Sequence, residues 1–167
     1  MRYDGHSELV KTAPRRLQDA LELLEPPTLE ASRSDAGYRH LCAAHYLAGY
    51  AVECALKAYV ILLLDQRHQQ HFSRWSHAIS HFGGQSNLPD LSGANSHDLA
   101  KLLIASELEQ QLDSDSAMKQ NWGLCRKWDY NTRYRPEHLV NRDEVVSFVD
   151  ACQATYDWIR QRIPFDD

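Results

Sequence analysis

An arginine and a histidine stand five positions apart in the segment Thr132-Arg133-Tyr134-Arg135-Pro136-Glu137-His138. A guanidinium binds phosphate oxygens in a bidentate manner and holds the negative charge that develops when a phosphodiester is attacked. An imidazole, with an unperturbed pKa of about 6.5, exchanges protons near neutral pH. Arg133 and His138 are therefore candidate catalytic residues for phosphodiester chemistry. An arginine that solvates a loop and a histidine that begins a helix would give the same pattern.

Residues 126–142 are the most basic part of an acidic chain. The whole protein of 167 residues has a formal net charge of -5, whereas this segment carries cations against only Asp129 and Glu137. The cations are Arg126, Lys127, Arg133, Arg135 and Arg142. Contact with nucleic acid is therefore expected at a local patch. We expect Arg126, Lys127, Tyr134 and Arg135 to bind substrate around Arg133 and His138.

A polar stripe lies earlier in the chain. It consists of His45, Gly49, Glu53 and Lys57, which follow one another at four-residue steps and therefore share one face of a helix. One interpretation is a Glu53–Lys57 pair within the helix, worth roughly 0.2–0.5 kcal/mol, with His45 packed in the core. The other places Glu53 and Lys57 beside the site, with Glu53 anchoring Arg133. In both, a buried carboxylate needs a cationic partner.

The length predicts one domain over residues 1–167, and 25% charged with 43% hydrophobic residues argue against extensive disorder. The first six residues lack the apolar core of a signal peptide, and no apolar run reaches the roughly 18 residues of a membrane span. We therefore expect a cytoplasmic protein without membrane contact. Four cysteines without a Cys-x-x-Cys pair are predicted to be reduced core residues: Cys42, Cys54, Cys125 and Cys152.

Hydrophobic residues recur at three- and four-residue steps over most of the chain, which predicts an all-α, up-and-down bundle of about five helices and no sheet. The first helix is expected to have Thr12 as its cap and Pro14 in its first turn, and to end at Pro26-Pro27. The second, over about residues 35–66, is apolar around most of its circumference. It is therefore the predicted central helix.

The third and fourth helices are predicted from Asn95 or Ser96 to about residue 112, and over about residues 115–128. The last follows Asn141 as its cap, with Glu144 at the capping-box position and an apolar 4-3-4-3-4 spacing over residues 145–163. Residues 67–95 read as an irregular insertion with one short helix over about 75–82. The insertion is rich in histidine, but no ligand pattern accompanies the histidines, so we expect no metal and no cofactor.

Several segments together resemble the HEPN (higher eukaryotes and prokaryotes nucleotide-binding) domain family. Residues 46–64 are similar to its second helix, His97-Asp98-Leu99 opens a later helix, and Trp128 with Thr132-Arg133-Tyr134 precedes a final long helix. The resemblance covers most of the chain in the family's order. It implies a helical domain that forms a homodimer in which the two copies of the motif loop face each other.

Many HEPN proteins are metal-independent endoribonucleases whose signature is arginine, four to six residues, then histidine, and Arg133 and His138 match it. The resemblance implies that His138 assists proton transfer at the ribose 2′-hydroxyl, that Arg133 stabilises the phosphorane, and that the product is a 2′,3′-cyclic phosphate. We therefore expect an endoribonuclease of a toxin–antitoxin or defence system that acts on single-stranded RNA.

Tyr134 departs from this signature, because the nucleases usually carry Asn or Asp directly after the arginine. Arg-Tyr is typical of HEPN branches not known to cut RNA. Two alternatives therefore remain open. One is a non-catalytic HEPN module that binds RNA, a nucleotide, or a nucleotidyltransferase or antitoxin partner, and the other is a plain dimeric scaffold.

Overall fold

The computed structural model describes residues 5–24, 35–82, 89–134 and 141–163, and within these ranges the regular structure is entirely helical. The predicted all-α bundle is thereby confirmed. The α-helices of the described residues are α1 (His6–Leu24), α2 (Asp35–His68), α3 (Trp75–Phe82), α4 (Leu99–Ala105), α5 (Glu109–Asp113), α6 (Ser116–Cys125) and α7 (Arg142–Arg160). Two 3-10 helices complete them, η2 (Gly93–His97) and η3 (Tyr130–Tyr134).

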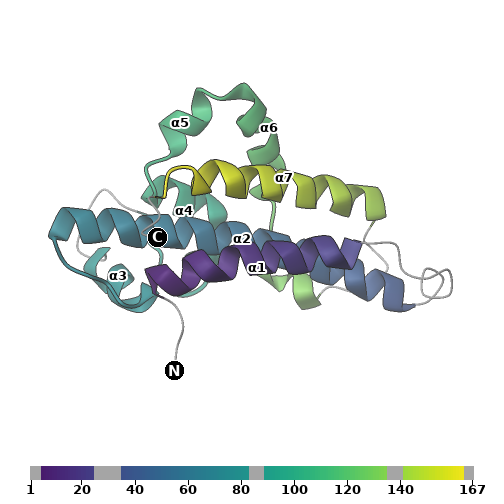
Figure 1. Ribbon diagram of the computed structural model, residues 1–167, viewed down its shortest axis with the longest axis horizontal. Coiled ribbons are helices and arrows are strands. Elements are labelled where there is room, and N and C mark those ends of the chain that lie inside the picture. The colour runs from purple at the N-terminus through teal and green to yellow at the C-terminus, as the bar shows by residue number, and fades with distance from the viewer. Residues whose placement is uncertain (1–4, 25–34, 83–88, 135–140, 164–167) are drawn as a thin grey trace.

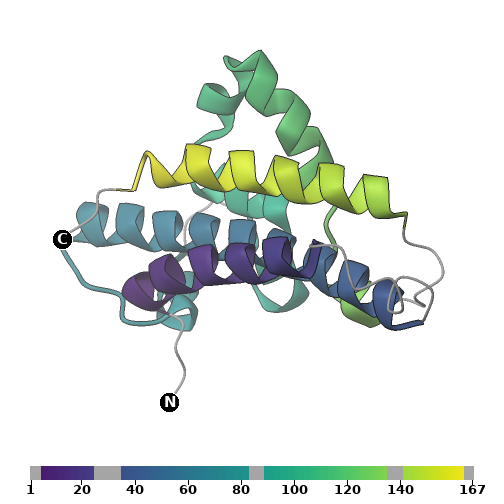
Figure 2. The same ribbon diagram turned by 45° about the vertical axis from the view of Figure 1, so that its right-hand side comes forward.

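The long helix α2 forms the centre of the bundle, with α1 and α7 packed along it (Figure 1). Helices α5 and α6 form a short arm on the far side of α7, and α4 and η3 also contact α2 (Figure 2). Every side chain over residues 51–58 is buried. Burial on all sides explains why α2 is apolar around most of its circumference, as the sequence predicts.

The part of α2 from His40–His68 is 29 residues long and is apolar enough to cross a membrane by length and composition alone. The core helix of a soluble bundle passes the same test, and 72% of the most apolar window of this helix is buried inside the protein. The absence of membrane contact therefore stays a prediction.

Helix α1 begins at His6, well before the predicted cap Thr12, and Pro14 lies inside the helix instead of in its first turn. That part of the prediction is wrong because the apolar face already starts at Leu9, which is buried with Ala13 against the core. This burial offsets the single backbone hydrogen bond that a proline removes. The predicted end at Pro26-Pro27 lies outside the described residues.

The predicted single helix from residue 95 to 112 is also wrong, because the chain forms η2, α4 and α5 there. Asp98 caps α4, and its carboxylate accepts hydrogen bonds from the backbone N–H groups of Ala100 at 2.9 Å and Lys101 at 3.2 Å. Helix α4 ends before Glu107. The backbone of Glu107 is left-handed, with a φ of 58°, and therefore cannot continue the helix.

The later helices follow the prediction more closely. Asp115 caps α6 through the backbone N–H of Met118 at 3.0 Å, although α6 ends at Cys125, three residues before Trp128. The Asn141 side chain caps α7 by accepting from the backbone N–H of Asp143 at 2.9 Å. The apolar positions predicted for this helix are all buried: Val145, Val149, Cys152, Tyr156, Ile159 and Ile163. The short helix predicted inside the insertion is α3.

Candidate functional site

Of the predicted catalytic pair, Arg133 lies in η3 and only its backbone is described. His138 and Arg135 fall in residues 135–140 and lie outside the described residues, as does the side chain of Tyr134. The geometry of Arg133 and His138 therefore stays a prediction. The surroundings of η3 are described, and they contain a pocket.

This pocket has a volume of about 300 Å³ and lies where η2, the start of α4, the end of α6 and η3 meet. We call it the η3 pocket. Arg126, a predicted substrate-binding residue, lines it, whereas the neighbouring Lys127 is exposed and is not in the lining. The described lining consists of Ala94, Asn95, His97, Asp98, Leu99, Arg126, Trp128, Asp129 and Tyr130. The pocket thus combines one exposed cation, one imidazole and aromatic rings.

Behind the η3 pocket lies a buried polar network centred on Glu53, whose side chain is 1% exposed. Its Oε1 accepts from Lys57 Nζ at 2.6 Å, and Oε1 and Oε2 lie 3.0 and 3.1 Å from His97 Nδ1. The expected cationic partner is therefore confirmed as Lys57, from the same helix. Whether Glu53 also contacts Arg133 lies outside the described residues.

The hydrogen bonds of this network offset the free-energy cost of burying the Glu53 carboxylate. Removing a carboxylate from water costs several kcal/mol, and Glu53 offsets that cost with two donors instead of one. Lys57 is itself 7% exposed and its ammonium lies 5.1 Å from the centre of the Trp75 ring, which adds a cation–π attraction. Trp75 is itself buried, so it packs in the core.

His97 connects the buried network to the pocket. Its side chain is 38% exposed, its Nδ1 faces the Glu53 carboxylate, and its ring centre lies 4.9 Å from that of Tyr130. An ionised carboxylate only accepts hydrogen bonds, so Nδ1 must carry a proton. Among the described residues, the hydrogen-bond contacts of the His97 ring are made through Nδ1.

The sequence did not single out His97 as a site residue. Its partner Glu53 lies 44 positions away, and no local spacing reports such a pairing. The sequence feature that could have indicated His97 is the segment His97-Asp98-Leu99, in which the N-cap of a helix directly follows a histidine. A capped helix start fixes the backbone of the residues beside it, so a polar side chain there is well positioned.

Gly49 determines how another lining residue of the η3 pocket, Trp128, packs on α2. A Cβ atom at this position would lie 2.1 Å from Trp128 Cδ1, so only glycine allows the indole to pack on α2. Trp128 is buried and precedes a turn in which the Asp129 carboxylate accepts from the backbone N–H of Asn131 at 2.9 Å. His45, the first residue of the predicted stripe, stacks on Phe148 at 3.9 Å between ring centres.

Tyr130 brings the η3 pocket close to the predicted motif. Arg133 follows Tyr130 by three residues in the same 3-10 helix. At about 2.0 Å of rise per residue, the two backbone positions lie about 6 Å apart along the helix axis. The pocket and the first residue of the Arg133–His138 motif therefore belong to one region of the fold.

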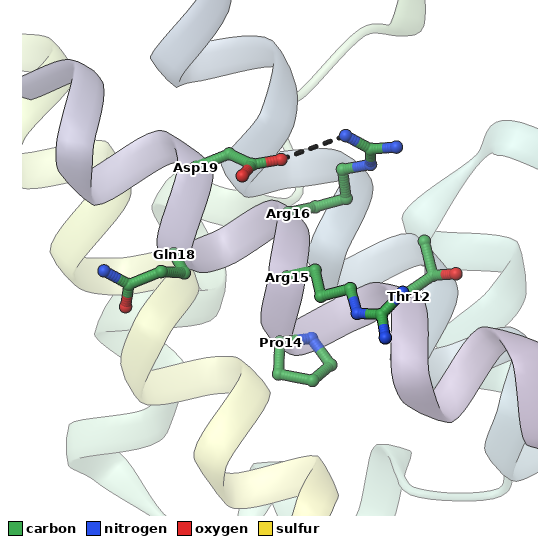
Figure 3. A pocket seen from close by; sticks show the side chains of 6 residues that line it. All are labelled: Thr12, Pro14, Arg15, Arg16, Gln18 and Asp19. Carbon is green, nitrogen blue, oxygen red and sulfur yellow. Dashed lines mark hydrogen bonds and ion pairs between the residues drawn. The ribbon is translucent and has the colours of Figure 1, made fainter.

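A second hollow, of about 560 Å³, lies on the surface of α1 (Figure 3). Its described lining comes from that helix alone, namely Thr12, Pro14, Arg15, Arg16, Gln18 and Asp19. Arg16 is paired with Asp19 at 2.9 Å on the exposed face. Because no second element among the described residues supplies converging groups, this hollow has the character of a surface depression.

The histidines of the insertion form no cluster that could hold a metal: in the described ranges, no three His, Cys, Asp or Glu side chains are suitably placed. His68 and His81 lie near each other, with ring centres 4.6 Å apart, and His71 pairs with Asp65 at 3.1 Å. The four cysteines are buried and none of them is in a disulfide, as expected. Burial raises the pKa of the Cys54 thiol to about 12, so this thiol stays protonated at neutral pH.

The η3 pocket and the network behind it together form the candidate site of the described residues. Comparison with known proteins finds no match for this chain among family models, curated proteins or solved structures.

Proposed function

We propose that this chain is an HEPN-type, RNA-targeting protein that acts as a dimeric, metal-independent endoribonuclease. The observation that carries the proposal is the η3 pocket, in which Arg126, His97 and Tyr130 adjoin the 3-10 helix that contains Arg133. A cation, an imidazole and an aromatic ring are the groups that bind a phosphate, move a proton and stack on a base.

The chemistry follows from the substrate. RNA carries its own nucleophile, the 2′-hydroxyl, so its cleavage requires proton transfer and charge stabilisation. In the proposed reaction His138 accepts the 2′-hydroxyl proton while O2′ attacks phosphorus, and Arg133 stabilises the charged phosphorane. The products are a 2′,3′-cyclic phosphate and a free 5′-hydroxyl. Arg126, Lys127 and Arg135 hold the flanking phosphates.

The proposed active form is a homodimer in the cytoplasm, with the motif loops of both copies contributing to one site. An acidic protein with a local basic patch would bind RNA there and repel it elsewhere. A role in a toxin–antitoxin or defence system, with an antitoxin or nucleotidyltransferase partner, is part of the same proposal.

A second candidate is a non-catalytic HEPN module that binds RNA, a nucleotide or a partner protein. The observation that favours it is Tyr134, which occupies the position where the nucleases usually carry Asn or Asp. In that case the η3 pocket is a binding site, and Arg133 and His138 contribute affinity without chemistry.

Cleavage of labelled single-stranded RNA in the presence of a chelator tests the proposal, with DNA of the same sequence as the control substrate. We expect RNA fragments with cyclic phosphate ends by mass spectrometry, and intact DNA. Replacing His138 by alanine should slow cleavage about a hundredfold to ten-thousandfold, whereas His77→Ala, at an exposed position on α3, should not. Binding without cleavage would favour the second candidate, and neither activity would refute both.

A further inference from the structure

We infer that His97 is a second proton-transfer residue of this site, which donates the proton that the leaving 5′-oxygen of the RNA needs. The inference rests on the proposed ribonuclease function and adds a catalytic residue to it. RNA cleavage of this type needs a base for the 2′-hydroxyl and an acid for the leaving oxygen. The proposed roles of Arg133 and His138 leave the acid unassigned.

The described geometry suits His97 for this role. Its Nδ1 lies 3.0 and 3.1 Å from the two oxygens of Glu53, a carboxylate that is 1% exposed, while the imidazole itself is 38% exposed. Since Nδ1 faces the buried carboxylate and His97 lines the η3 pocket, the inference places Nε2 on the exposed side of the ring, toward the pocket. A carboxylate behind Nδ1 fixes the orientation of the ring and determines which nitrogen meets a substrate.

A purely structural role explains less of this arrangement. Glu53 already has a cationic partner in Lys57 at 2.6 Å, and α4 is already capped by the carboxylate of Asp98. Neither the ion pair nor the helix start requires His97. Nevertheless, both oxygens of a buried carboxylate are within hydrogen-bond distance of it, and Tyr130 packs against its ring.

The charged groups around His97 are compatible with an anionic substrate in the η3 pocket. Among the described residues, the titratable groups of the Glu53 network and of the pocket lining around His97 are Glu53 and Lys57 from α2, Asp98 at the start of α4, and Arg126, Asp129 and Tyr130 in the segment from α6 to η3. Asp98 is engaged in capping α4, and Asp129 accepts from the backbone N–H and the side-chain amide of Asn131. Arg126 is exposed, so a phosphate bound to it would lie in the same pocket as Nε2.

The proposed step balances as follows. As O2′ attacks phosphorus, the bond between phosphorus and O5′ breaks and its electron pair goes to O5′. The proton on Nε2 of the His97 imidazolium moves to O5′, which leaves a neutral imidazole with its remaining proton on Nδ1, facing Glu53. The proton taken from the 2′-hydroxyl by His138 passes to solvent, and solvent reprotonates His97.

A substrate with a sulfur atom in place of the leaving 5′-oxygen tests this role. A thiol has a pKa of about 8.5, so a thiolate leaves without receiving a proton and no longer needs a general acid. We would measure cleavage of natural RNA and of this 5′-bridging phosphorothiolate RNA by the wild-type protein and by His97→Ala, His138→Ala and His77→Ala. Thermal denaturation would check that each variant is folded.

We expect His97→Ala to cut natural RNA about a hundredfold to ten-thousandfold more slowly and to cut the sulfur-containing RNA at close to the wild-type rate. His138→Ala should be slow on both substrates, and His77→Ala normal on both. An unchanged rate for His97→Ala on natural RNA would overturn the inference, as would an equal loss on both substrates. In those cases the proposed function survives if His138→Ala is inactive. A wild-type protein that cuts neither substrate would refute both.

Discussion

The buried pair of Glu53 and Lys57 allows a direct test of the core of this fold. The two side chains are 1% and 9% exposed and their charged atoms lie 2.6 Å apart. Removing one partner of a buried pair leaves an uncompensated charge, which destabilises a protein by about 3–5 kcal/mol. For a chain of this size, about 2–4 °C of melting temperature corresponds to 1 kcal/mol. We therefore expect Glu53→Met or Lys57→Met to lower the melting temperature by roughly 6–20 °C.

The double variant, with Met at positions 53 and 57, should recover most of this loss, because an apolar pair of similar volume is often as stable as a buried ion pair. Chemical denaturation of the four proteins gives the coupling energy between the two positions. Arg16→Met is the matched control, since its pair with Asp19 is about half exposed and should change stability by less than about 0.5 kcal/mol. Wild-type stability in both single variants would refute the argument that Glu53 and Lys57 are charged in the folded core.

Four further outcomes can be measured. Gly49→Ala should destabilise the protein by about 1–3 kcal/mol and change tryptophan fluorescence, because the new Cβ would meet Trp128, whereas Gly123→Ala, with no atom within 4 Å, should be neutral or stabilising. Cys54 should stay unreactive toward a thiol reagent at pH 8 until the protein unfolds, since its pKa is raised to about 12 and the thiolate is the reactive form; fast labelling of Cys54 in the folded protein would contradict this. Sedimentation at micromolar concentration should give twice the chain mass, and a monomer would remove the composite-site model. A chelator should leave the melting temperature unchanged, and a fall of several degrees would indicate a structural metal.

The sequence predicted the long elements of this fold because they are periodic. Helix α7 was predicted together with its cap, since Asn141 precedes an apolar spacing that continues for five turns. The break between α4 and α5 was not predicted, because it depends on the left-handed backbone of Glu107, a residue type that carries no such signal. The early start of α1 was missed for a related reason: burial against α2 outweighed the local preference of Pro14.

The site was predicted less completely, since spacing along a helix shows which residues share a face but not what they contact. His45, Gly49, Glu53 and Lys57 share a face of α2, yet each contacts a different residue outside that helix: Phe148, Trp128, His97 and Trp75, respectively. These partners come from α7, the segment after α6, η2 and α3. Long-range pairs of this kind arise from tertiary packing, so their identity requires the structure.

The positions of Gly49 and Glu53 on α2 have a consequence for how the η3 pocket keeps its shape. Gly49 sets the depth of Trp128, and Glu53 sets the orientation of His97, and both Trp128 and His97 line the pocket. Gly49 and Glu53 lie four positions apart, or about 6 Å along one helix. Because a packed helix is rigid and both residues are buried, α2 itself supports both of these lining residues in a fixed relation. Substitutions in the buried stripe of α2 should therefore change ligand binding in the pocket, although these residues do not line it themselves. Residues that support a site from behind control its geometry in the same way in other proteins.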